Sequence, residues 1–127
     1  MPEGKKILVV DDDPDIQLSC RIVLEGAGYT VVSALSSADG KRMVDSELPD
    51  VLLLDIMMED ADSGLQVANW MGEHHPKIPV MVLSSIADAA GQVFDTSSLP
   101  VADMVNKPIA ADELLAKVAR MLATASK

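Results

Sequence analysis

Residues 6–14 read KILVVDDDP, a short apolar run followed by three acidic residues and a proline. The leucine- and valine-rich run is typical of a β-strand, predicted here over Lys6–Val10. The Asp13-Pro14 pair offers an N-cap followed by proline in the first turn of a helix. The stretch therefore predicts a strand that leads into a helix, with Asp11 and Asp12 at the junction.

The same alternation recurs along the chain. Helical spacing of apolar residues separates the apolar runs, and Gly26, Gly28 and Ser36 are typical of helix ends or caps. Strands alternating with helices, several strands being apolar throughout, predict a parallel sheet covered on both faces. We expect a doubly wound α/β fold with a five-stranded sheet of order 2-1-3-4-5. The further strands are predicted over Thr30–Ala34, Val51–Leu54, Ile78–Leu83 and, with a weaker pattern, Ala102–Val105.

Length, composition and charge restrict the classes of function. The chain has 127 residues, of which 49% are hydrophobic, so we expect one domain over 1–127. Its single cysteine, Cys20, cannot form an intramolecular disulfide, and we expect a cytoplasmic, reducing environment. The formal charge of −10 disfavours nucleic-acid binding, and no apolar run is long enough to predict membrane insertion.

Polar residues follow the predicted strands at the points where ligands bind in this kind of fold. They are Asp11 and Asp12 after the first strand, Asp55 after the third, Ser84-Ser85 after the fourth and Lys107 after the fifth. Each residue alone could be a cap, a turn residue or a solvated charge. Together, however, the aspartates would crowd three carboxylates at one edge, which repulsion disfavours unless a cation compensates. We therefore expect a hard divalent cation, Mg²⁺, at this edge.

These residues resemble the signatures of the two-component response-regulator receiver family. The resemblance covers essentially the whole chain and implies a flavodoxin-like receiver fold that serves as a signalling switch. It rests on four stretches in order: Ile7 to Asp12, Val51 to Asp55, Leu83 to Ser85, and Asn106 to Pro108.

The resemblance implies that Asp55 accepts a phosphoryl group from a sensor histidine kinase or a histidine phosphotransfer protein. It also implies that Asp12 binds Mg²⁺ directly and that Asp11 binds it partly through water. The backbone carbonyl of Met57 would be a further ligand. A downstream protein or an output domain would respond. A chain with this role is a phosphoryl acceptor with slow self-dephosphorylation, not a turnover enzyme.

For the other two signatures, the resemblance implies that Ser84, with Ser85 beside it, hydrogen-bonds the phosphoryl group, and that Lys107 pairs with a phosphoryl oxygen. The position three before Lys107 usually holds an aromatic switch residue, but here it is Met104. Methionine is apolar and flexible, so it can fill a pocket but has no hydroxyl or rigid ring.

Other positions also depart from the family pattern. Glu59 stands where a proline is usual, in an acidic loop, and the segment Ile86–Pro100 is a poor continuous helix, which predicts a short or displaced fourth helix. Met57 and Ile86 occupy positions that tune hydrolysis. Two apolar residues there either shield an acyl phosphate from water or simply pack in the core.

Two alternatives remain open. The altered switch position and loop are compatible with a receiver-like interaction module that works without phosphorylation. A magnesium-dependent phosphatase of the haloacid dehalogenase type would use Asp11 and Asp13 with Ser84 and Lys107. In that case Asp55 would have no role.

Overall fold

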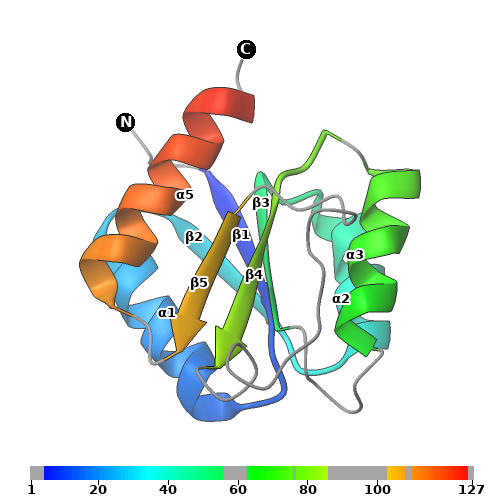
Figure 1. Ribbon diagram of the computed structural model, residues 1–127, viewed down its shortest axis with the longest axis horizontal. Coiled ribbons are helices and arrows are strands. Elements are labelled where there is room, and N and C mark those ends of the chain that lie inside the picture. Colours follow the sequence, from blue (N-terminus) through cyan, green and yellow to red (C-terminus); the bar gives the residue numbers. More distant parts are fainter. Residues whose placement is uncertain (1–4, 56–62, 76, 86–102, 108–109, 126–127) are drawn as a thin grey trace.

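The computed structural model describes residues 5–55, 63–75, 77–85, 103–107 and 110–125. Parallel strands and helices alternate through the described residues of 6–85, and a further strand and helix occupy 103–107 and 111–125 (Figure 1). The strands are β1 (Lys6–Val10), β2 (Thr30–Ala34), β3 (Val51–Asp55), β4 (Val80–Ser85) and β5 (Asp103–Lys107). The helices are α1 (Pro14–Gly26), α2 (Ser37–Glu47), α3 (Ser63–His74) and α5 (Ala111–Ala125).

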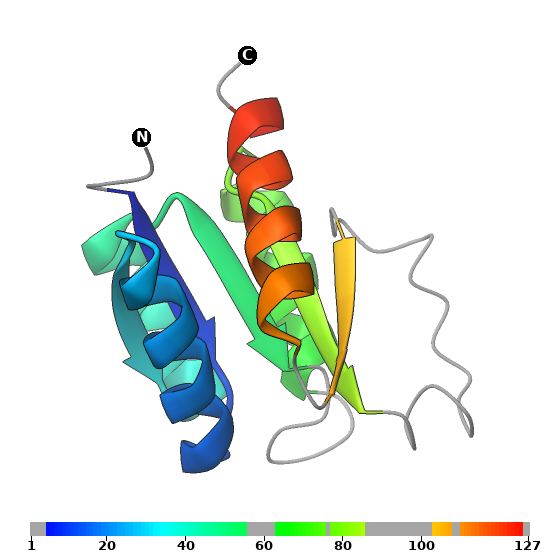
Figure 2. The same ribbon diagram turned by 90° about the vertical axis from the view of Figure 1, so that its left-hand side faces the viewer.

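The strands form a sheet of order β2-β1-β3-β4-β5 in which every neighbouring pair is parallel. Helices α1 and α5 cover one face, and α2 and α3 cover the other (Figures 1 and 2). Strand order reverses at β1, and the helices that come after β1 and β3 in the chain, α1 and α3, lie on opposite faces of the sheet. This is the switch point at which doubly wound α/β proteins bind ligands.

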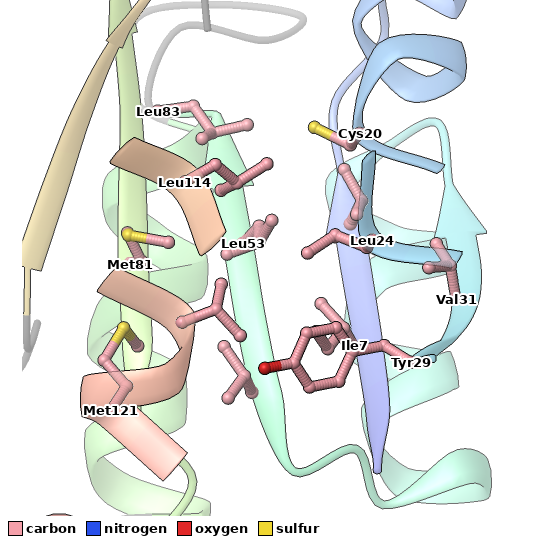
Figure 3. Packing of buried hydrophobic residues seen from close by; sticks show 13 residues of the cluster. Ile7, Cys20, Leu24, Tyr29, Val31, Leu53, Met81, Leu83, Leu114 and Met121 are labelled. Carbon is pink, nitrogen blue, oxygen red and sulfur yellow. The ribbon is translucent and has the colours of Figure 1, made fainter. Parts of the chain in front are cut away.

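Alternate residues of the strands enter two apolar layers. Ile7, Val9 and Leu53 belong to the cluster under α1 and α5, part of which Figure 3 shows, whereas Leu8 and Leu52 belong to the cluster under α2 and α3. The period of two places successive side chains on opposite faces, so a strand buried on both faces is apolar throughout. Two buried layers hold the carboxyl ends of the strands in fixed positions.

Buried contacts also set how the outer elements sit on the sheet. The ring of Tyr29 points into the first cluster beside Ile7 (Figure 3), and burial raises the pKa of its hydroxyl above the ordinary value of 10.0. On the other face, a Cβ added to Gly40 of α2 would lie 3.0 Å from both Cγ atoms of Val10. Glycine therefore lets α2 approach β1 closely, next to the residue that precedes Asp11.

Helix boundaries follow the local signals in the sequence. The Asp13 side chain accepts a hydrogen bond from the Asp15 backbone N–H at 2.9 Å, and α1 begins at Pro14. The Ser36 hydroxyl accepts one from the Asp39 N–H at 3.1 Å. Both predicted caps are confirmed.

The bounds of three predicted strands need correction. β3 includes Asp55, β4 runs from Val80 to Ser85 instead of 78–83, and β5 runs from Asp103 to Lys107 instead of 102–105. Backbone pairing between parallel strands continues through polar residues, because the ladder uses N–H and C=O groups and not side chains. The prediction placed each end at the last apolar residue and was therefore too short there.

Leu48 adopts a left-handed conformation (φ 46°, ψ 64°) at the C-cap of α2, with 63% of its surface exposed. This conformation costs an L-residue about 1–2 kcal/mol but costs glycine almost nothing, although glycine gains entropy in the unfolded chain. Leu48→Gly is therefore expected to raise the free energy of unfolding by about 0.5 kcal/mol, as measured by urea denaturation. Leu35→Gly is the control, because Leu35 is also exposed (54%) but has no positive φ. It should lower stability. A loss of stability in Leu48→Gly would contradict this account of the cap.

The described helices include none that is both long and apolar enough to cross a lipid bilayer. α5 is the longest of them, with 15 residues, and it carries acidic residues in its first turn.

Candidate metal and phosphoryl site

Two neighbouring strands bring Asp11 and Asp55 together. Asp55 is the last residue of β3, and Asp11 follows the last residue of β1. Val10 and Leu54 are paired in the β1–β3 ladder, so the next residue of each strand emerges at the same level of the sheet edge. Both aspartates are buried, with 0% and 3% of their surface exposed.

Asp12 completes a cluster of three carboxylates. Asp12 is exposed, whereas Asp11 and Asp55 are buried. One carboxylate oxygen from each of the three residues lies within 4.8 Å of the others. The sequence predicted this convergence from the order of the strands. The geometry makes one exposed and two buried acids available to a ligand that arrives from solvent.

Hydrogen bonds fix the turn that carries Asp11 and Asp12. The Asp11 Oδ1 accepts a hydrogen bond from the Asp13 N–H at 2.9 Å, and Asp13 in turn caps α1. Aspartate favours such turns because its short side chain reaches the backbone two residues later. The first turn of α1 is therefore continuous with the site.

The donor set of the cluster suits a hard divalent cation. Burying carboxylates beside one another is costly unless positive charge or hydrogen bonds compensate. Mg²⁺ takes oxygen ligands, usually one or two carboxylates with waters, and an exposed third carboxylate leaves the cluster open to solvent. The three residues thus fit the ion by ligand chemistry and by access.

The ends of β4 and β5 bring two further predicted residues to the same edge. Asp55 is paired with Leu83, so Ser84 lies one residue beyond this pair on the neighbouring strand. In the next ladder, Ser84 is paired with Asn106 and Ser85 with Lys107. The described backbone therefore carries Ser84, Ser85 and Lys107 to the edge that holds Asp55, and the roles of their side chains stay predictions.

The remaining predicted positions divide into two groups. Met104 lies in β5, where its backbone is paired with Val82. Met57, Ile86, the acidic loop with Glu59 and the expected fourth helix lie outside the described residues.

Sequence reasoning missed Gln17. Its amide is buried with 7% exposed surface, and its Nε2 donates to the backbone carbonyl of Asp11 at 3.0 Å. A signal was present, because Gln17 stands three residues before Cys20 and seven before Leu24, on the inward face of α1. A polar residue on that face needs a buried partner, and the partner here is the turn of the site.

The sequence matches the family described as "Response regulator receiver domain" over residues 7–119. It is 35% identical over 117 residues to the response regulator MprA of Mycobacterium ulcerans, covering 92% of this chain and 50% of that protein. It is 32% identical over 121 residues to the transcriptional regulatory protein GltR of Pseudomonas aeruginosa, covering 94% of this chain and 49% of that protein. The chain thus spans about half the length of these relatives.

Solved structures agree in fold. The receiver domain of NtrX from Brucella abortus aligns with a TM-score of 0.80 and 25% identity over 93% of this chain and 98% of that one. A longer structure of NtrX gives a TM-score of 0.86 and 26% identity, covering 95% of this chain and 27% of that one. Together with the match over 7–119, these similarities show that the chain belongs to the response regulator receiver domain family.

Proposed function

We propose that the chain is a single receiver domain over 1–127 that accepts a phosphoryl group on Asp55, with Mg²⁺ held by Asp11, Asp12 and Asp55. The observation that carries the proposal is the cluster of three carboxylates within 4.8 Å at the switch point of the sheet, two of them buried. Converging carboxylates do not by themselves stabilise the fold, since like charges repel. A bound cation would offset this repulsion.

The proposed reaction is a transfer between two nucleophiles. An Asp55 carboxylate oxygen attacks the phosphorus of a phosphohistidine on the donor protein, a P–O bond forms, and the P–N bond breaks. The donor imidazole leaves with the bonding electron pair and takes up a proton. The product is an acyl phosphate on Asp55.

The difficulty of this step is electrostatic, because an anionic carboxylate approaches an anionic phosphoryl group. When bound, Mg²⁺ supplies positive charge that offsets the charge on the phosphoryl oxygens. Asp11 and Asp12 would hold the ion, and the Met57 carbonyl would be a further ligand. Asp55 would contribute one oxygen to the ion and use the other as the nucleophile.

Ser84 and Lys107 are proposed to respond to the phosphoryl group. Ser84 in β4 and Lys107 in β5 lie at the sheet edge that carries Asp55. The Lys107 ammonium would pair with one phosphoryl oxygen, and the Ser84 hydroxyl, with Ser85 beside it, would donate to another. A conformer in which both contacts form gains population on phosphorylation, and this change is the switch.

A sensor histidine kinase or a histidine phosphotransfer protein is the proposed phosphoryl donor. A downstream protein or an output domain is the proposed target of the signal. The net charge of −10 makes direct nucleic-acid binding by this domain unfavourable. The phosphoryl group stays on the acceptor until hydrolysis, so the domain acts as a switch and not as a turnover enzyme. Met57 and Ile86 are proposed to slow that hydrolysis by shielding.

Incubation with acetyl phosphate, with and without Mg²⁺, tests the proposal. The intact mass is expected to increase by one phosphoryl group only when Mg²⁺ is present. The small donor removes the need for the cognate kinase, so a negative result cannot be attributed to a missing partner. No gain with Mg²⁺ at saturating donor would favour the phosphorylation-independent interaction module, for which Met104 in β5 is the supporting feature.

The phosphatase alternative is disfavoured by the position of Asp13. That mechanism needs the Asp13 carboxylate beside Asp11, but Asp13 Oδ1 caps α1 by accepting the Asp15 N–H. Asp12 and not Asp13 belongs to the carboxylate cluster with Asp11 and Asp55.

A further inference from the structure

Gln17 links three backbone carbonyls at the carboxyl edge of the sheet. Its Nε2 lies 3.0 Å from the carbonyl oxygens of Val9 and Asp11, and 2.9 Å from that of Ala34. An amide nitrogen has two N–H groups, so three acceptors share two donors. One side chain of α1 thus ties together the ends of β1 and β2.

The place where Gln17 binds is the point at which the two strands separate. The last backbone hydrogen bond there joins the Asp11 N–H to the Ala34 carbonyl at 3.1 Å. Among the described residues, no backbone N–H beyond this bond links β1 to β2. The Gln17 amide instead donates to the Asp11 and Ala34 carbonyls there. The Gln17 side chain therefore continues the hydrogen bonding between β1 and β2 into the turn that carries Asp11 and Asp12.

The two ends of the Gln17 amide differ in their hydrogen bonding. The Gln17 Oε1 is buried and accepts no hydrogen bond from the residues that the structure describes. A buried acceptor without a donor costs free energy, whereas the Nε2 of the same amide donates to three backbone carbonyls. A buried polar group of this kind calls for an explanation other than packing.

The carbonyl of Asp11 supplies that explanation. It belongs to the peptide unit that joins Asp11 to Asp12, the two carboxylates that precede α1. Rotation of this unit changes ψ of Asp11 and φ of Asp12, and so moves one carboxylate relative to the other. Gln17 holds the carbonyl side of the unit, while the Asp13 N–H holds the Asp11 carboxylate at 2.9 Å.

We propose that Gln17 is a positioning residue for the metal site: its amide fixes the Asp11–Asp12 peptide unit so that both carboxylates converge with Asp55 before any ion binds. The inference rests on the proposed function, since it assumes that the carboxylates bind Mg²⁺. A neighbour that orients metal ligands typically changes metal affinity by 10–100-fold when it is lost. Gln17 would act through the backbone of the ligands, because its hydrogen bonds go to backbone carbonyls.

The test is the Mg²⁺ affinity of Gln17→Met, measured by isothermal titration calorimetry on folded, unphosphorylated protein. Methionine keeps the length of the side chain and removes both N–H donors. Its dissociation constant for Mg²⁺ is expected to be about tenfold higher than that of the wild type. The control is Leu24→Ala, which removes a fully buried side chain at the other end of the same helix. This control lowers stability but is expected to keep wild-type affinity.

The outcomes separate the two proposals. Wild-type affinity in Gln17→Met, or an equal loss in Leu24→Ala, would overturn the role of Gln17 while leaving the metal site intact. If the wild type itself does not bind Mg²⁺, the proposed function fails and the inference fails with it. If Gln17→Met does not fold, Gln17→Asn takes its place, because it keeps the amide but is too short to reach all three carbonyls. The same loss of affinity is then expected.

Discussion

Asp55→Asn is expected to abolish phosphorylation by acetyl phosphate, even when Mg²⁺ is saturating. The reaction needs an anionic oxygen to form the acyl phosphate, and the neutral amide of asparagine does not provide one. The substitution keeps the size of the side chain at a position that is 3% exposed, so the surrounding packing is retained. The measurement is the intact mass after incubation, compared with wild type at equal concentration.

The control for this prediction is Asp39→Asn, which removes one negative charge from the surface of α2. Asp39 pairs with Arg42 at 2.8 Å and does not belong to the carboxylate cluster. It is expected to be phosphorylated to the same extent as the wild type. Full phosphorylation of Asp55→Asn would show that another residue is the acceptor.

Asp12→Asn is expected to weaken Mg²⁺ binding by about 100-fold or more. Loss of a residue that only supports a ligand already costs 10–100-fold, and Asp12 is proposed to bind the ion directly. The same change removes one of three mutually repelling carboxylates, so the metal-free protein should become more stable by about 0.5 kcal/mol. Opposite effects on metal affinity and on metal-free stability are the signature of a site arranged for a cation.

Thermal or urea denaturation detects both effects. At a Mg²⁺ concentration one hundred times the wild-type dissociation constant, binding stabilises the wild type by about 2.7 kcal/mol. A hundredfold weaker variant gains only about 0.4 kcal/mol at that concentration. The stabilisation by Mg²⁺ should therefore almost disappear in Asp12→Asn.

Asp13→Asn is the matched control for Asp12→Asn. It removes the same charge from the adjacent residue, and asparagine is as good an N-cap as aspartate. Because Asp13 caps α1 and lies outside the cluster, Mg²⁺ affinity should stay within about threefold of wild type. Equal losses in the two variants would mean that general charge, and not ligation by Asp12, controls the affinity.

The class of fold and the convergence of the three aspartates could be predicted because they depend on short-range pattern and on topology. The run over Lys6–Val10 matches the observed strand, and the carboxyl ends of parallel strands necessarily meet at one edge. Asp11 and Asp55 could then be brought together without coordinates. That Asp12 is exposed while the other two are buried depends on packing and required the structure.

Other features could not be predicted, for identifiable physical reasons. The polar ends of β4 and β5 are strand residues because the backbone ladder continues past the last apolar side chain. The function of Gln17 depends on where α1 rests against the ends of β1 and β2, and a periodic pattern does not give that position. Conversely, the predicted shielding by Met57 and Ile86 concerns residues outside those that the structure describes, and it stays a prediction.

The most direct test of the central claim is the identity of the phosphorylated residue. After incubation with acetyl phosphate and Mg²⁺, the acyl phosphate is reduced with borohydride, which converts an aspartyl phosphate into homoserine. Peptide mapping by mass spectrometry then locates the change. We expect homoserine at position 55 and at no other position. Homoserine at position 11 or 12, or a phosphoryl group that survives reduction on serine or histidine, would contradict it.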